Sequence, residues 1–440
     1  MNGKAGLHRT LTLRDLVVYG IICIQPTAPM PMFGVVSQEA QGHVVTTVLI
    51  AMIAMLLTAV SYGRMARVYP SAGSAYAYIS GEFGRTAGFF TGWSILLDYL
   101  LNPLICTIWC SSAAANFIPG VPAPLWNIFF AGLFTILNLR GVEASARTNQ
   151  LLAIFMGAVV VWMLACILRY FLLQPPHDAA FYTRPFFDPA TFQIARVSTG
   201  VSIAALTYIG FDSISTLSEE AINPHRNIMR ATVLTCLLTG VLAAIECYAG
   251  QLVWPDFRHY PDLDTAYVFI AERVGGKALF TLVNGTLLLA TIASGTGAML
   301  GSARLIYGMG NGGALPRAFA YVSPGSGVPS RNVLLCGAIA LIGAWTINYQ
   351  LGAEMLNFGA FLAFIGVNAA ALRHYYWNSQ TRRFADALMP LVGAAVCLYI
   401  WWSLRWQAKL AGFLWLGAGA IYFLIRRQSA PLASRKVASL

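Results

Sequence analysis

Charge is scarce in this sequence of 440 residues, where Asp, Glu, Lys and Arg together make up only 10%. Soluble globular domains carry about 25% charged residues, whereas this chain is 58% hydrophobic and has a mean hydropathy of +0.64. This composition excludes a water-soluble enzyme, a disordered protein and a disulfide-stapled scaffold. At about 20 apolar residues per crossing, such a length accommodates about ten to twelve membrane helices and little else. We therefore predict an all-α polytopic protein embedded in a lipid bilayer.

Patterns typical of metal binding and catalysis are also missing. The six histidines lie in loops or at the ends of expected helices and form no H-x-x-x-H or H-E-x-x-H pattern, and the eight cysteines form no C-x-x-C pair. We expect no metal site, no cofactor and no enzyme activity. A membrane-embedded enzyme and a channel are the weaker alternatives, because neither a cluster of acid, base or metal ligands nor a ring of like charge is visible.

Basic residues predict the orientation. Most of the 28 Lys and Arg residues fall on the side that holds both termini of a twelve-helix chain. By the positive-inside rule, this predicts a multi-pass protein of the cytoplasmic (inner) membrane with both termini in the cytoplasm. The same rule explains the net charge of +11 without a nucleic-acid partner. The expected helices lie near residues 14–38, 44–63, 86–116, 123–139, 148–173, 193–218, 229–253, 278–308, 332–349, 354–376, 386–403 and 408–425.

Two of the expected helices are interrupted. The first contains Pro26, Pro29 and Pro31, which a regular helix does not accommodate because each proline lacks an N–H group and clashes with the preceding turn. The sixth contains Gly210 beside Asp212. Both are compatible with simple kinks, which membrane helices tolerate. Interruptions at matching positions of two halves instead favour a transporter built from inverted repeats, with its substrate held at the breaks.

Several motifs resemble those of the amino acid–polyamine–organocation permeases. The segments that carry the resemblance are 210–220 with 223–228, 69–76, 301–313 and 261–266. The resemblance runs from about residue 11 to the end of the twelfth helix, and it implies the leucine-transporter fold and secondary active transport. It also implies a division into a cytoplasmic tail (1–13), a first five-helix repeat (14–173), an inverted second repeat (191–376), helices 11 and 12 (386–427) and a cytoplasmic tail (428–440).

Acids inside the membrane are candidates for function because each is costly to insert. We place Asp98, Asp212 and Glu246 well inside helices. Asp212 is the strongest candidate, Asp98 is as consistent with a structural role, and Glu246 is better explained by structure. The predicted substrate site consists of Gln25, Pro26, Thr27, Ala28, Asp98, Tyr99, Tyr208, Ile209, Gly210, Phe211 and Asp212.

The prolines of the first helix indicate the type of substrate. They remove N–H donors that would hold a carboxylate, and they leave carbonyl acceptors that suit an ammonium group. Tyr99, Tyr208 and Phe211 add possible cation–π contacts, although aromatic residues in membrane helices also pack. Residues 25–33 further resemble the putrescine-importer branch of the family. We expect import of a small amine such as putrescine, with a neutral or cationic amino acid as the alternative.

The coupling ion is open at this stage. Some relatives carry a lysine in the fifth helix that replaces a sodium ion, whereas this sequence has Met156 in the corresponding stretch. Asp212 or Asp98 is a candidate proton carrier. Ser294 and Thr296 are candidates for a sodium site with carbonyls of the first helix, although hydroxyls in membrane helices usually bond to their own backbone. Exchange against an internal amine is also compatible with the sequence.

Two acids follow the sixth helix, where negative charge opposes the helix dipole. We predict that Glu219 and Glu220 form a gate ion pair with arginines of the same side, of which Arg64 and Arg304 are the main candidates. The alternative is a solvated acidic helix end.

Overall fold

The computed structural model describes residues 9–71, 73–141, 146–175, 178–311, 313–323, 327–380 and 382–429. Within these ranges the regular elements are helices, and the one strand-like pairing joins Leu11 to Ala221. The two tails expected at 1–13 and 428–440 lie largely outside the described residues.

Helices of the first half follow the predicted order. They are α1 (Leu13–Ile24), α2 (Phe33–Glu39), α3 (Val44–Val68), α4 (Ser74–Phe83), α5 (Arg85–Phe117), α6 (Ala123–Leu139), α7 (Ala146–Leu172) and the short α8 (Ala179–Thr183). Together α1 and α2 form the interrupted first helix. The short helix α4 stands where the sequence indicates only a re-entrant loop.

Helices of the second half complete the bundle. They are α9 (Ile194–Ala204), η1 (Ala205–Tyr208), α10 (Ser213–Thr216), α11 (Pro224–Val253), α12 (Ala266–Asn311), η2 (Arg317–Ala320), α13 (Ser330–Thr346), α14 (Tyr349–Leu372), the π-helical turn η3 (Arg373–Trp377), α15 (Phe384–Trp402) and α16 (Trp406–Ser429). In the described residues, nine helices are long and apolar enough to cross a membrane, and α6 and α13 are shorter apolar helices. With the interrupted first helix, they account for the twelve predicted crossings.

Two helix starts differ from the prediction. Helix α12 begins at Ala266 rather than near residue 278, and it bends at Gly276, whose φ is 68°. The charged residues Glu272, Arg273 and Lys277 hide this extension from a hydropathy criterion. Helix α14 begins at Tyr349 rather than near residue 354, because the Asn348 side chain caps it by accepting the N–H of Leu351 at 2.9 Å.

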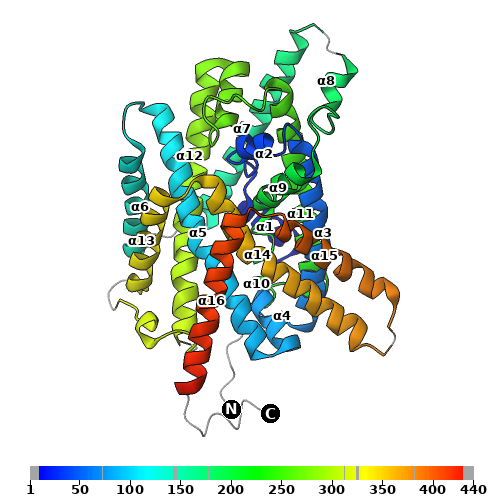
Figure 1. Cartoon of the computed structure of the whole chain (residues 1–440), viewed down its shortest axis with the longest axis vertical. Coiled ribbons are helices and arrows are strands. Elements are labelled where there is room, and N and C mark those ends of the chain that lie inside the picture. The colour runs from blue at the N-terminus through cyan, green and yellow to red at the C-terminus, as the bar shows by residue number, and fades with distance from the viewer. Residues whose placement is uncertain are drawn as a thin grey trace.

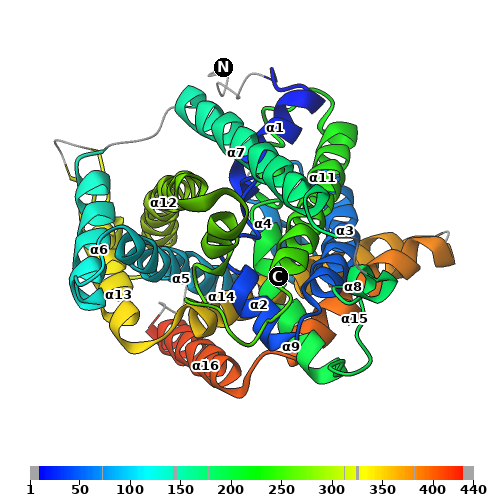
Figure 2. The same cartoon turned by 90° about the horizontal axis from the view of Figure 1, so that it is seen from above.

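Small residues allow the central helices to approach closely. Helix α5 packs against α12 and α14 in the middle of the bundle (Figure 2), and Gly359 of α14 lies directly against the backbone of Ser94 and Asp98. Helix α11 packs along α3, where Gly63 faces Met229 and leaves no room for a larger side chain. Backbones in such contact are typical of helix packing in membranes.

The periphery and the two ends of the bundle are clearly separated. Helices α6 and α13 lie together at one edge and α15 at the other (Figures 1 and 2). Helices α4 and α8 lie at opposite ends of the bundle (Figure 1), so they identify its two faces below.

Candidate substrate site

The first helix is broken where its prolines predict. Helix α1 ends at Gln25, whose φ of 72° leaves the helical region, and the chain resumes a helix only at Phe33. The Gln25 side chain holds the break against α12 by donating from Nε2 to the carbonyl of Ala290 at 3.2 Å. The break therefore exposes main-chain groups in the middle of the bundle.

The sixth helix is broken at the predicted glycine. After η1, Ile209 is extended and Gly210 has a φ of 117°, a conformation that L side chains rarely adopt. A Cβ atom at Gly210 would lie 3.4 Å from the carbonyl group of Cys23. The two breaks therefore lie side by side, as expected for one composite site.

Two carboxyl groups share the interior next to these breaks. Asp98 of α5 and Asp212 at the start of α10 are close enough to interact electrostatically. Both lie deep in the bundle, yet both residues are partly accessible, and Tyr99 is 38% exposed. Accessible polar side chains at this depth indicate a wet cavity.

Three further residues surround Asp212 that the sequence alone does not single out. Tyr19 and Cys23 of α1 and Ser213 of α10 lie within hydrogen-bonding reach of one another, and both α1 side chains are partly accessible. Tyr19 and Cys23 are spaced four residues apart and therefore share one face of α1. That face leads directly to the break at Gln25, which is the signal that could have identified them.

Several predicted site residues are packed rather than accessible in this structure. The Tyr208 hydroxyl donates to the carbonyl of Val48 at 2.9 Å, and the Phe211 ring packs against Tyr62 at a centroid distance of 5.4 Å. Both rings are fully buried. The aromatic with accessible surface beside the acids is Tyr99, so the cation–π roles of the other two rings stay predictions.

The remaining predicted residues lie on either side of the two breaks. Pro26 and Thr27 are buried, while Ala28 and Ile209 are half-buried. The Thr27 hydroxyl lies 3.4 Å from the sulfur of Met156 on α7. Met156 therefore contacts the break of the first helix, where it contributes an apolar group.

The two candidate ligands for a coupling ion turn away from the break. The Thr296 hydroxyl donates to the carbonyl of Ile292 in its own helix at 2.7 Å, and Ser294 lies within hydrogen-bonding reach of Cys106 on α5. The α12 group that contacts the first helix is instead the carbonyl of Ala290. A sodium site at these hydroxyls stays a prediction.

The predicted gate residues are at the α4 face, with a different partner for one of them. Arg64 pairs with Asp386 of α15 at 2.9 Å. The Glu220 carbonyl accepts the N–H groups of Thr10 and Leu11, while Glu219 and Arg304 are exposed. A gate ion pair that involves Glu219 or Glu220 stays a prediction, since Arg64 is paired with Asp386 here.

Hydrogen bonds close the bundle at the face of α8. Trp109 of α5 donates from Nε1 to the carbonyl of Asp264 at 2.8 Å, and Asn116 donates to the Thr265 hydroxyl at 3.0 Å. These bonds tie the segment before α12 to α5. Burial raises the pKa of Asp264 to about 6, with a smaller contribution from the charge of Asp262.

Charged residues reinforce the same face. Glu39 at the end of α2 lies 3.4 Å from Arg196 of α9 and accepts a hydrogen bond from Gln350 of α14 at 2.9 Å. Glu354 of α14, which is fully buried, pairs with Arg405 at 2.6 Å. The sequence analysis placed only three acids well inside helices; this was wrong for Glu354, because α14 begins one turn earlier than hydropathy indicates.

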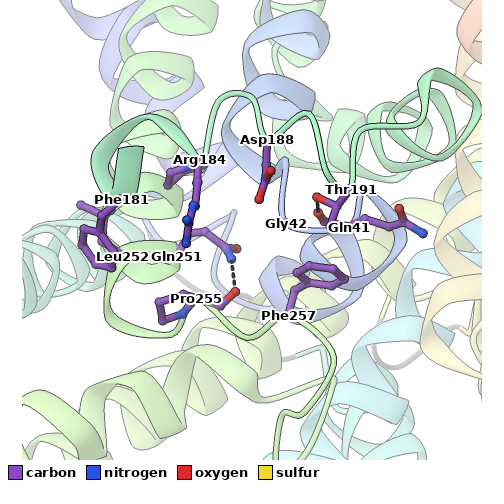
Figure 3. A pocket seen from close by; sticks show the side chains of 11 residues that line it. Gln41, Gly42, Phe181, Arg184, Asp188, Thr191, Gln251, Leu252, Pro255 and Phe257 are labelled. Carbon is purple, nitrogen blue, oxygen red and sulfur yellow. Dashed lines mark hydrogen bonds between the residues drawn. The ribbon is translucent and has the colours of Figure 1, made fainter. Parts of the chain in front are cut away.

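A separate pocket lies at the α8 face (Figure 3). It is formed by the loop after α2, the segment after α8 and the end of α11, and its labelled side chains include Asp188, Arg184 and Phe257. The described residues that line it include none of the predicted substrate residues. The two breaks and the two acids therefore form a different site.

Comparisons with known proteins agree with this geometry. The sequence model of the family described as "Amino acid permease" matches residues 30–438. The low-affinity putrescine importer PlaP of Escherichia coli (strain K12) is 34% identical over 430 residues, covering 95% of this chain and 94% of the relative. The methylthioribose transporter of Bacillus subtilis is 26% identical over 448 residues, and it is covered to 94% by 96% of this chain. The branched-chain amino acid permease BcaP of Lactococcus lactis is 26% identical over 447 residues, with 94% of each chain covered.

These matches extend over nearly the whole sequence and include both interrupted helices. The relatives are permeases and transporters rather than enzymes. The architecture of twelve crossings with broken first and sixth helices is that of the leucine-transporter fold. The chain belongs to the amino acid permease family.

Proposed function

We propose that this permease imports a small amine across the cytoplasmic membrane by alternating access, and that its substrate is a diamine such as putrescine. The observation that carries the proposal is the pair of carboxyl groups, Asp98 and Asp212, in one cavity beside two broken helices. Two acids suit a ligand with two ammonium groups, because each carboxylate neutralises one charge that would otherwise be buried. Tyr99 adds an accessible aromatic surface for a cation.

Main-chain groups of the first helix support an amine over a carboxylate. In the break, Ala28 donates its N–H to the carbonyl of Gln25, and Met30 donates to the carbonyl of Thr27. The prolines have no N–H to offer. Donors that would hold a substrate carboxylate are therefore absent or already used in this part of the described chain.

An amino acid is the second candidate. The permease BcaP, at 26% identity, is a branched-chain amino acid permease by name. A cationic amino acid would place its side-chain ammonium between the acids, but its carboxylate would then need a donor that the break of the first helix does not supply.

The proposed orientation places both termini in the cytoplasm of a bacterial-type inner membrane. Basic residues concentrate at the α4 face, in agreement with the positive-inside rule. Residues 10–11 bond to Glu220 after α10, and Arg426 near the end of α16 lies beside Gly313 after α12. Both described chain ends thus lie near the same face, which supports repeats at 14–173 and 191–376 followed by helices 386–427.

The conformation supports access from the α4 face. Tyr76 of α4 is 50% exposed and lies over Gly88 and Gly92, one and a half turns or more before Asp98 on α5. The α8 face is closed by the Trp109 and Glu39 contacts described above. Under the proposed orientation this is an inward-facing state, and either a proton or a sodium ion is a candidate for coupling.

Substrate counterflow in proteoliposomes tests this function. Vesicles loaded with unlabelled putrescine should accumulate labelled putrescine, and Asp98→Asn should weaken diamine binding more than monoamine binding. A thermal-shift screen of the purified protein provides the matched binding assay, since a ligand of the folded state raises its melting temperature. Stabilisation by leucine or arginine, but not by putrescine, would replace the amine with an amino acid. Product formation would instead identify an enzyme, and unsaturable flux a channel.

A further inference from the structure

Two buried tyrosines lie directly beneath the acids without hydrogen-bond partners. Tyr62 of α3 and Tyr78 of α4 are fully buried, and neither hydroxyl forms a hydrogen bond of good geometry within the described residues. Their rings are packed edge to face, with centroids 6.0 Å apart. Buried polar groups are nearly always paired, because an unpaired one costs about 1–3 kcal/mol, so exceptions are candidates for a functional role.

The position of these hydroxyls links the substrate cavity to the α4 face. The Tyr62 hydroxyl interacts electrostatically with Asp212 and Asp98 on one side and with Tyr78 on the other. The Tyr78 hydroxyl lies beside the hydroxyl of Ser215, one turn after Asp212. Tyr62 is thus the group between the acids and the second tyrosine.

The chain of hydroxyls continues to the surface of the bundle. The hydroxyls of Ser215 on α10 and Ser74 at the start of α4 are 2.7 Å apart. Ser74 is partly accessible, and it begins the helix at this face. In this structure Ser215 donates to the carbonyl of Asp212 at 2.7 Å, so rotation of its hydroxyl redirects the hydrogen toward Ser74.

We propose that the coupling ion is a proton, and that Asp212 releases it to the α4 face through Tyr62, Tyr78, Ser215 and Ser74. A hydroxyl accepts one proton while it donates another. The O–H bond of the Asp212 carboxylic acid breaks, each hydroxyl passes on one hydrogen as it receives one, and Ser74 gives the last to water. The net change is one proton moved from Asp212 to water, with no oxidant, reductant or other reactant.

The other groups around Asp212 are compatible with this role. They are Tyr19 and Cys23 on α1, Asp98 and Tyr99 on α5, and Cys236 on α11. All are neutral or acidic types, so the groups that interact with Asp212 supply no fixed positive charge. A mobile cation, either the amine or a proton, is then what balances the carboxylates at each stage of the cycle.

Removal of single hydroxyl oxygens tests the inference, which rests on the proposed transport function. Tyr62→Phe and Tyr78→Phe keep the packed rings, and because these hydroxyls are unpaired, the melting temperature should stay equal or rise. In proteoliposomes we expect putrescine counterflow at equal pH to stay within about twofold of the unsubstituted protein. Accumulation driven by a pH gradient, and the accompanying proton flux, should fall at least about tenfold, since a positioned proton-transfer group contributes about 10²-fold or more.

Tyr267→Phe is the matched control. Its hydroxyl is also fully buried, but it donates to the carbonyl of Glu246 at 3.0 Å on the other side of the bundle. Both counterflow and gradient-driven accumulation should be unaffected in this variant.

The outcomes separate the inference from the function on which it rests. Unchanged gradient-driven accumulation in Tyr62→Phe would overturn the path, as would sodium-dependent accumulation without proton flux. A lowered melting temperature with equal loss of counterflow and accumulation would show a structural role and would also overturn it. If the unsubstituted protein gave no counterflow with putrescine, leucine or arginine, the transport function itself would fail, and the proton path with it.

Discussion

Loss of Arg405 should destabilise the protein through a buried carboxylate. Glu354 is fully buried, and its two oxygens are held by Nε of Arg405 at 2.6 Å and by the Arg405 N–H at 2.9 Å. Breaking a fully buried ion pair by removing one partner costs about 3–5 kcal/mol. The Arg405 side chain is 30% exposed, so water compensates part of the loss, and we expect about 1–3 kcal/mol for Arg405→Ala.

Intrinsic fluorescence during heating of the detergent-purified protein measures this effect, since the chain contains 11 tryptophans. The expected decrease in melting temperature is about 2–6 °C. Arg196→Ala is the matched control, because its pair with Glu39 is longer, at 3.4 Å, and its side chain is 54% exposed. That variant should change stability by no more than about 0.5 kcal/mol.

A double variant isolates the cause. Glu354→Gln combined with Arg405→Ala removes the unpaired charge, so it should recover part of the lost stability. Equal melting temperatures for Arg405→Ala and Arg196→Ala would refute the reasoning from burial. A double variant as unstable as Arg405→Ala would show that packing, rather than charge, is responsible.

Three further predictions concern the breaks and the α8 face. Asp212→Asn should abolish uptake while leaving expression near normal, and full uptake would remove Asp212 from the site. Gly210→Ala forces a Cβ into a backbone with φ of 117°, so it should lose about 1–3 kcal/mol and reduce uptake, whereas Gly157→Ala on α7, where a Cβ meets nothing within 4 Å, should be neutral or stabilising; equal melting temperatures would contradict this. Because burial raises the pKa of Asp264 to about 6 from 3.8, the folded state retains a proton that the unfolded state has lost, and stability should fall as pH rises from 4 to 6. Asp264→Asn should flatten that part of the melting curve against pH, and parallel curves would argue against the effect.

Much of the fold follows from two physical signals in the sequence. Long charge-poor segments have few alternatives to membrane helices, and proline or glycine at membrane depth predicts the breaks that the structure has at 25–32 and 209–212. The start of α12 could not be predicted in this way, because its first turns carry charge. The position of α4 depends on tertiary packing against α5 and α14, which hydropathy does not report.

The candidate site was predictable only where a residue is unusual for a membrane. Asp98 and Asp212 stand out because acids are rare there. Tyr62 and Tyr78 do not, since aromatics are common in membrane helices, and the absence of a partner is visible only in the structure. The partner of Arg64 was equally hidden, because Asp386 lies 322 residues further along the chain.

The short pairing at the beginning of the described chain has a mechanical consequence. Thr10 and Leu11 donate to Glu220, and Ile222 donates back to Leu11, which fastens the entry of the first helix to the exit of the sixth. The inner parts of the two broken helices are thereby yoked, so that a tilt of one carries the other with it. A chain shortened to begin at Asp15 would release this yoke, and the two halves would then be able to swing independently and leak.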